Sequence, residues 1–151
     1  MRSRPGGRED EKGVIMPPFD AITANAEGDS SARFELKIIA DSSTLTTGDG
    51  QLIFAVPSDM NGMNLVDADA FVTTVSSSGT PTVQIRNVTD AVDMLTTKIT
   101  IDANEYTSYT AATAPVIDVA HDDVATGDLI AIDVDVAGTG AKGLGVMLVF
   151  R

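Results

Sequence analysis

The chain has 151 residues, a length typical of one domain that is large enough to bury a hydrophobic core. Hydrophobic residues make up 43% of it and Trp is absent, so general disorder is excluded and the predicted core consists of Val, Ile, Leu, Ala and Met. The absence of Cys excludes disulfides, thiolate zinc sites and cysteine nucleophiles. The 10 basic and 22 acidic residues give a formal net charge of −12, which disfavours direct binding to nucleic acid or anionic lipid.

This charge is unevenly distributed along the chain. Residues 1–12 carry four basic and three acidic side chains, a net of 4 − 3 = +1, whereas residues 13–151 carry 6 and 19, a net of 6 − 19 = −13. No run of apolar residues follows the basic N-terminus, and none is long enough to cross a bilayer. The sequence therefore predicts a weakly basic tip on a strongly acidic body, made in the cytoplasm and without a membrane span.

Residues 1–30 are predicted to form an extended N-terminal arm rather than a domain. The segment is polar and rich in Gly and Pro, and Pro17 and Pro18 fix the backbone angle φ and disfavour helix in the preceding residue. Two interpretations stay open: a tail without fixed structure, and an arm that orders against a neighbouring subunit. In the second, the apolar residues Met16, Phe19 and Ile22 anchor the arm. A second start of translation at Met16, with residues 1–15 as an extension, is an alternative that the sequence leaves open.

The pattern from residue 34 onward predicts β-strands. Apolar residues alternate with polar ones, as Phe34, Leu36 and Ile38 do, and this period of two is typical of half-buried strands. The last segment, residues 144–150, is apolar at both alternate sets of positions, which predicts a central strand or a subunit interface. The predicted strands are residues 34–38, 52–56, 64–75, 83–86, 98–102, 116–119, 130–136 and 144–150.

Turn residues separate these strands, and helical periodicity is nearly absent. Gly, Asn and Asp lie between most segments, and the one helical candidate is a single turn at residues 90–95. About eight strands without sustained helices favour an all-β fold for residues 31–151, namely an antiparallel β-sandwich, a jelly roll or a related Greek-key barrel. The spacing alone leaves the strand connectivity open.

Two pairs of acidic residues on strands are the candidates for catalysis. Asp67 with Asp69, and Asp133 with Asp135, stand two residues apart, so both carboxylates of a pair project from one face about 7 Å apart. That separation is compatible with acid–base work on a glycosidic bond, but the pattern is more typical of a solvated outer face of a sandwich. The glycine-rich residues 138–143 precede a strand and predict a hairpin loop rather than a phosphate cradle. We expect no catalytic site.

Four acidic residues near the end of the chain are the candidate metal ligands. Asp118, Asp122, Asp123 and Asp128 lie in one predicted loop, and carboxylate oxygens are the ligands that Ca²⁺ prefers. Their spacing fits no EF-hand loop, so the sequence favours a plain acidic loop with no metal and no cofactor. His121, the single His, lies in the same loop and is predicted to be a surface residue.

Several stretches of the chain resemble small β-sandwich structural proteins that are encoded among the head and tail genes of tailed bacteriophages. The resemblance spans about residues 16–151 and lies in the general character of the sequence, as shared by a diverse family, rather than in a match to one protein. The stretches that carry it are residues 16–26 (MPPFDAITANA), 60–68 (MNGMNLVDA), 82–90 (TVQIRNVTD), 93–102 (DMLTTKITID) and 126–150, which ends in GLGVMLVF.

The resemblance implies a non-enzymatic component of the virion. Such proteins form homotrimers that decorate or cement the capsid, or they build fibres and tail appendages, and their N-terminal arms attach to the major capsid protein or to a neighbouring subunit. The residues of this arm that we expect to contact a partner are Arg2, Arg4, Arg8, Met16, Pro17, Pro18, Phe19 and Ile22.

A receptor- or carbohydrate-binding module is the alternative function. Sugar sites usually offer aromatic side chains for stacking, and Tyr106 and Tyr109 are the two Tyr residues of the chain, close together in a predicted loop. They are the best candidate contacts for a glycan. The competing interpretation, which the general behaviour of Tyr favours, is a pair of half-buried loop residues.

Overall fold

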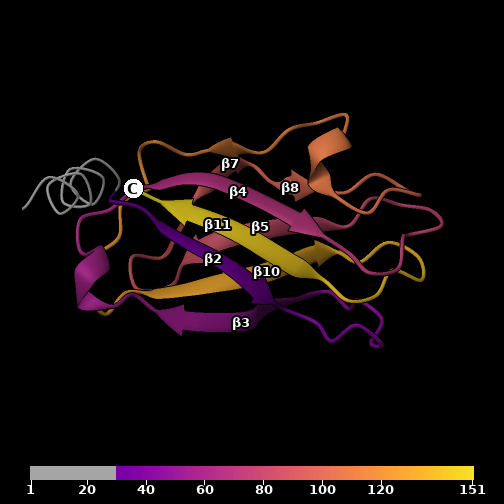
Figure 1. Ribbon diagram of the computed structural model, residues 1–151, viewed down its shortest axis with the longest axis horizontal. Coiled ribbons are helices and arrows are strands. Elements are labelled where there is room, and N and C mark those ends of the chain that lie inside the picture. Colours follow the sequence, from indigo (N-terminus) through magenta and orange to yellow (C-terminus); the bar gives the residue numbers. More distant parts are fainter. Residues whose placement is uncertain (1–29) are drawn as a thin grey trace, which may run out of the picture. The chain divides into compact units, whose positions relative to one another are not determined.

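The computed structural model describes residues 30–151, which form ten strands and two short 3-10 helices (Figure 1). The predicted arm, with Arg2, Arg4, Arg8, Met16, Pro17, Pro18, Phe19 and Ile22, lies outside the described residues. The elements are β2 (Ala32–Lys37), β3 (Gly48–Ala55), η1 (Ser58–Met60), β4 (Leu65–Phe71), β5 (Thr82–Asn87), β6 (Val92–Asp93), β7 (Leu95–Thr97), β8 (Ile99–Thr100), η2 (Ser108–Thr110), β9 (Val116–Ile117), β10 (Leu129–Val136) and β11 (Gly145–Phe150).

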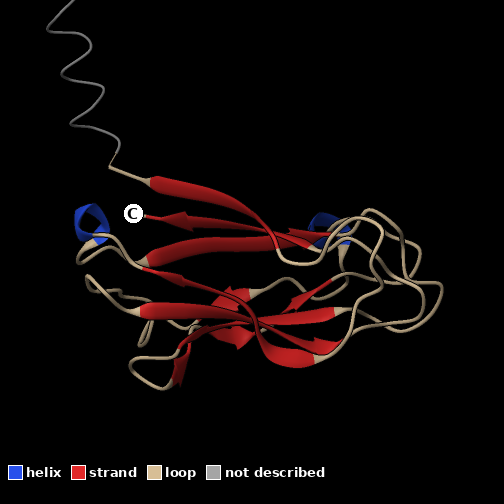
Figure 2. Ribbon diagram, turned by 90° about the horizontal axis from the view of Figure 1, so that it is seen from below, coloured by secondary structure: helices blue, strands red, loops and turns tan. Residues whose placement is uncertain are grey.

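Eight of the ten strands form two antiparallel sheets that pack face to face (Figure 2), which confirms the predicted all-β sandwich, and β7 pairs with β9 in a separate two-stranded sheet. One sheet has the order β2-β11-β4 and the other the order β3-β10-β5-β6, with β8 also paired to β5. Successive strands β2, β3, β4 and β5 alternate between the sheets, and the last two strands, β10 and β11, take central places. This is the strand order of a jelly roll. Each of the eight predicted segments contains a strand.

The core lies between the two sheets and is built from the inward residues of the central strands. β11 contributes Val146, Leu148 and Phe150, and every one of them is fully buried. β10 contributes Ile130 and Ile132, which are equally inaccessible to solvent. Burying one such side chain stabilises the fold by about 1.5–3 kcal/mol, so these two strands hold the sandwich together. The prediction that residues 144–150 form a central strand is confirmed.

The outward face of β11 explains the glycine at its start. Gly145 pairs with Lys37 on one side and Phe71 on the other, and the Phe71 ring lies over it, where a β-carbon would overlap the ring. The ammonium nitrogen of Lys37 stands 5.0 Å from the centre of the same ring. A glycine is therefore required at this point because an aromatic side chain from the neighbouring strand fills its place.

The predicted helical turn at residues 90–95 is wrong. The side chains of Asn87 and Asp90 close a tight turn, since the Asp90 N–H donates to Asn87 Oδ1 at 3.2 Å and Asn87 Nδ2 donates to Asp90 Oδ2 at 3.0 Å. Ala91 then adopts a left-handed backbone with φ of 60°, and the chain returns as β6 to pair with β5. Local side-chain bonds to the backbone thus favour a hairpin over a helix. Among the described residues no helix is long and apolar enough to cross a membrane.

A β-bulge changes the predicted faces of β4. The alternation of apolar residues in the sequence predicts that Val66 shares one face with Ala68, Ala70 and Val72, but Val66 is exposed and Leu65 is buried in its place. The cause is a register shift opposite β11, where Val149 pairs with Asp67 and the next residue, Phe150, pairs with Leu65. One extra residue in β4 therefore turns Val66 outward.

Candidate interaction surfaces

No pocket is detected over the described residues, so the candidate sites are surfaces. The first is the outer face of the β2-β11-β4 sheet. Its centre is formed by Met147 and Val149 of β11, both partly exposed. In register, Met147 lies between Glu35 and Asp69, and Val149 lies between residues of β2 and β4 in the same way. An apolar stripe flanked by charged rows is a composition that suits contact with another protein.

The helix η2 covers one border of this face through a buried polar contact. Ser108 Oγ donates to Asp69 Oδ1 at 2.7 Å and accepts from the Ala70 N–H at 3.0 Å, so it links η2 to β4. Burial raises the pKa of the Asp69 carboxyl, the bond from Ser108 opposes this, and the charge of Asp67 adds to the rise. The expectation of a solvated Asp67 and Asp69 pair is wrong for Asp69, which Ser108 covers.

The two Tyr residues are both exposed, so the interpretation of half-buried loop residues is wrong. Tyr106 is 60% and Tyr109 67% exposed. The Tyr109 hydroxyl lies 3.7 Å from Met147 Sδ, which places this ring at the apolar stripe. Partial desolvation raises the pKa of the Tyr109 phenol, and the charges of Asp69, Asp67 and Glu35 raise it further. The loop therefore extends the apolar surface beyond the sheet itself.

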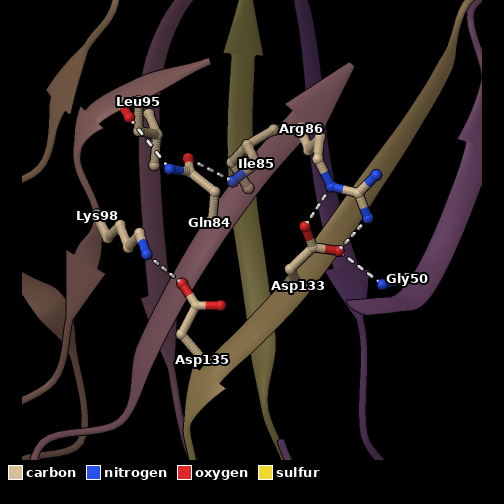
Figure 3. A network of polar contacts seen from close by, with 8 residues as sticks. All are labelled: Gly50, Gln84, Ile85, Arg86, Leu95, Lys98, Asp133 and Asp135. Carbon is tan, nitrogen blue, oxygen red and sulfur yellow. Dashed lines mark hydrogen bonds and ion pairs between the residues drawn. The ribbon is translucent and has the colours of Figure 1, made fainter. Parts of the chain in front are cut away.

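The outer face of the other sheet carries an ion pair between a buried carboxylate, Asp133, and a partly exposed Arg86 (Figure 3). Asp133 accepts from Arg86 Nε at 2.6 Å and Arg86 Nη2 at 2.9 Å, and its Oδ1 also accepts from the Gly50 N–H at 2.6 Å. Burial disfavours the charged form of Asp133, but the bonds from Arg86 and Gly50 outweigh it and hold the pKa of this carboxyl below its ordinary value. A general acid needs a raised pKa, so this geometry suits a structural role for Asp133.

Neighbouring polar contacts extend this network across β5 and β10. Lys98 Nζ lies 2.7 Å from Asp135 Oδ2, in a more exposed ion pair. Gln84 Nε2 donates to the Leu95 carbonyl at 3.1 Å, and Gln84 Oε1 accepts from the Ile85 N–H at 2.9 Å (Figure 3). Asp133 and Asp135 thus form ion pairs with different basic side chains, Arg86 and Lys98, and the sequence pattern predicted neither partner.

The predicted acidic loop does not gather its carboxylates. Asp118 Oδ2 lies 2.8 Å from His121 Nδ1, Asp122 accepts from an Asn side chain, and Asp128 accepts from the Ala125 N–H at 2.9 Å. The bond between Asp118 and His121 lowers the pKa of the carboxyl and raises the pKa of the exposed imidazole. Within residues 30–151 no group of three or more acidic or His side chains is placed to hold a metal ion.

The glycine-rich residues 138–143 are not a hairpin loop. They connect β10 to β11, which belong to different sheets, so the segment crosses from one layer of the sandwich to the other. Gly138, Gly140 and Gly143 all have positive φ, between 69° and 74°, a backbone that other residues rarely adopt. The glycines therefore allow the backbone conformations with which this segment crosses from one sheet to the other.

A further surface, which the sequence did not reveal, is a row of partly exposed apolar residues between β2 and β3, which we name the β2–β3 seam. It consists of Phe34 and Leu36 on β2 and Leu52 and Phe54 on β3. The rings of Phe34 and Phe54 approach each other across the two sheets, with centres 5.6 Å apart.

Comparisons with family models, curated proteins and solved structures found nothing that matches this chain.

Proposed function

We propose that this protein is a non-enzymatic structural component of a tailed-bacteriophage virion. In this proposal it decorates or cements the capsid, binds the major capsid protein or a neighbouring virion subunit, and acts as an oligomer, specifically a homotrimer. It is made in the host cytoplasm and resides in the virion, without direct contact to nucleic acid or membrane.

The observation that carries the proposal is the jelly-roll strand order. This sandwich is a recurrent building block of viral capsid proteins, and it also occurs in lectins, so it supports a role in assembly or recognition. The apolar stripe of Met147 and Val149 adds a surface suited to contact between subunits. The resemblance of residues 16–151 to phage structural proteins points to the same class.

The arm is the proposed means of attachment. Its apolar residues Met16, Phe19 and Ile22, with Pro17 and Pro18, would bury surface on a partner, and each fully buried side chain contributes about 1.5–3 kcal/mol. Ordering the backbone opposes this by about 1–2 kcal/mol per residue, so only a segment with dense contacts becomes fixed. The basic residues of the arm, Arg2, Arg4 and Arg8, would meet an acidic partner surface, an attraction that salt weakens.

Truncation of the arm tests this function. We expect a variant that starts at Ser31 to lose binding to particles that lack the native protein, while circular dichroism still reports β-structure. Replacement of Arg2, Arg4 and Arg8 by Gln is the milder variant, for which we expect weaker binding and a smaller effect of salt. If the truncated protein decorates particles with unchanged affinity, the arm is not the attachment. Light scattering of the full chain should give three times 15.7 kDa, and a persistent monomer would contradict the trimer.

Exposure of Tyr106 and Tyr109 favours a second candidate, a receptor- or carbohydrate-binding module. Exposed aromatic rings can stack on the apolar face of a sugar. We expect this function to show as glycan-array or host-cell binding that is lost in Tyr106→Ala and Tyr109→Ala. As a matched control, Val119→Ala removes an exposed apolar side chain elsewhere and should have no effect.

A further inference from the structure

The β2–β3 seam is a side of the sandwich where inward apolar residues are only partly buried. Each seam residue pairs, across the sheet, with a residue that is fully buried, although both face the same core. The central strands are covered on all sides, whereas β2 and β3 form the lower border of the two layers in Figure 1. These pairs are Phe34 with Leu148, Leu36 with Val146, Leu52 with Ile132 and Phe54 with Ile130.

The backbone of β3 is also open on this side. The Val56 N–H donates to the Asp128 carbonyl at 2.8 Å, and bonded residues alternate along an antiparallel pair. The amide groups of Ile53 and Ala55 therefore face away from β10, where the described residues supply no pairing strand. Ile53 is also 52% exposed on the outer face. An edge with free backbone groups and apolar side chains is a site at which another strand can add.

We infer that the β2–β3 seam of one copy receives residues 16–22 from the arm of a neighbouring copy. This inference rests on the proposed oligomer and identifies the surface that binds the arm. Phe19 and Ile22 would cover the partly exposed seam residues, and residues 19–22 would pair with the free edge of β3. Pro17 and Pro18 lack an N–H, so they fit at the beginning of an added edge strand and not within it.

The length of the arm allows this exchange. Ala32 lies ten positions after Ile22, and an extended chain covers about 3.3 Å per residue, which gives about 33 Å. A domain of this size has a radius of gyration of about 14 Å, so the arm can reach across to a neighbour. This length would let either a chain's own arm or a neighbour's arm reach a seam, and we infer the neighbour's arm because it links the copies of the proposed oligomer. Such head-to-tail contacts can close into a ring.

The net negative charge of the folded body opposes association between copies, so an oligomer needs a specific contact that offsets this repulsion. Residues 30–151 contain 6 basic and 16 acidic side chains, a net of 6 − 16 = −10, so the bodies of two copies repel each other. The arm is the part of the chain with a basic tip, since residues 1–12 carry a net of +1. Seating residues 16–22 on the seam brings that tip to the acidic body of the neighbour. The contact thus combines apolar burial with a weak attraction.

Engineered disulfides test the inference cleanly, because the full chain has no Cys. One copy carries Phe19→Cys, and a second copy, enlarged by a tag, carries Leu36→Cys, Leu52→Cys or Phe54→Cys. The two are mixed, exchanged under mild denaturation and oxidised. We expect a covalent heterodimer on a non-reducing gel with at least one seam position. The matched control is Val119→Cys, which is 83% exposed and lies outside the seam, and we expect no heterodimer with it.

The same Cys positions placed in one chain separate the two sources of the arm. We expect a Phe19→Cys, Leu52→Cys double variant to form covalent oligomers. A cross-linked monomer would overturn the inference by showing that a chain's own arm fills its seam. Absence of any cross-link at the three seam positions would also overturn it. Particle binding is measured separately on the chain without Cys substitutions. Decoration by that chain, together with no cross-link in the variants, would reject the seam and keep the proposed function, and a cross-link without decoration would reject the function alone.

Discussion

Replacing Arg86 by Met is expected to destabilise the fold markedly at neutral pH. The variant keeps most of the aliphatic side-chain volume but leaves Asp133 as a buried carboxylate that retains only the bond from the Gly50 N–H. A charge without its partner inside a protein is costly, since its lost hydration is no longer compensated. The effect therefore reports the geometry of Figure 3 directly.

The magnitude follows from the burial of the two partners. Breaking a fully buried ion pair costs about 3–5 kcal/mol, and a pair on the surface is worth about 0–1 kcal/mol. The Asp133 side chain is 6% exposed and that of Arg86 28%, so this pair lies nearer the buried limit. We expect Arg86→Met to lower the free energy of unfolding by about 2–3 kcal/mol. Lys98→Met, which removes the more exposed partner of Asp135, should cost less than about 1 kcal/mol.

Urea unfolding followed by circular dichroism measures both variants under the same conditions. A double variant, Arg86→Met with Asp133→Leu, removes the orphaned charge and should recover much of the loss. If Arg86→Met costs no more than Lys98→Met, Asp133 is not the buried, paired carboxylate described above.

The pH dependence provides a second measurement of the same pair. The pKa of Asp133 is lowered in the folded protein, so its contribution is fully present above the unfolded pKa of about 3.9 and is lost as the pH falls through the lower folded value. In Arg86→Met the burial of Asp133 is no longer offset by Arg86, and its folded pKa should rise. The difference in stability between wild type and variant should therefore be largest near pH 7 and shrink below about pH 4.

Three further outcomes are expected. Leu148→Ala should cost about 2–5 kcal/mol in urea unfolding because Leu148 is fully buried, and Val149→Ala on the outer face about 1 kcal/mol or less; equal costs would contradict the described faces of β11. The pKa of Asp69 is raised in the folded protein, so the contribution of its protonated form to stability is complete below the unfolded pKa and is lost as the pH rises through the folded pKa. Asp69→Asn cannot titrate, so between pH 4 and 7 its Tm should fall less than that of the wild type. EDTA should change Tm by less than about 5 °C, and a larger drop would assign an ion to residues 118–128.

The sequence predicts the strands of this protein well because half-buried strands impose a period of two. All eight predicted segments contain a strand, and the central position of β11 follows from its apolar residues on both faces. The strand and helix predictions fail where a single extra residue or a side-chain hydrogen bond overrides the periodic pattern of the sequence. The bulge at Val66 reverses a face, and the bonds between Asn87 and Asp90 replace a helical turn with a hairpin.

The surfaces could be predicted only in part, because they depend on contacts between distant residues. Arg86 and Asp133 are 47 positions apart, and only the pairing of β5 with β10 brings them together. The β2–β3 seam depends in the same way on the strand order, which spacing along the chain leaves open. Tyr106 and Tyr109 were identified from residue type alone, but their exposure is a property of the folded loop.

The central place of the last strand has a consequence for biosynthesis. β2 and β4 flank β11 and have no direct pairing with each other, so their sheet forms only after residues 145–150 have left the ribosome. Until then the apolar faces of both strands stay uncovered, and a fold with such distant pairings closes slowly. Ribosome stalling a few residues before Gly145 should therefore yield a chain that is sensitive to protease, whereas stalling well beyond residue 151 should yield a resistant one. Synthesis of the final six-residue strand would be the event that commits the chain to its fold.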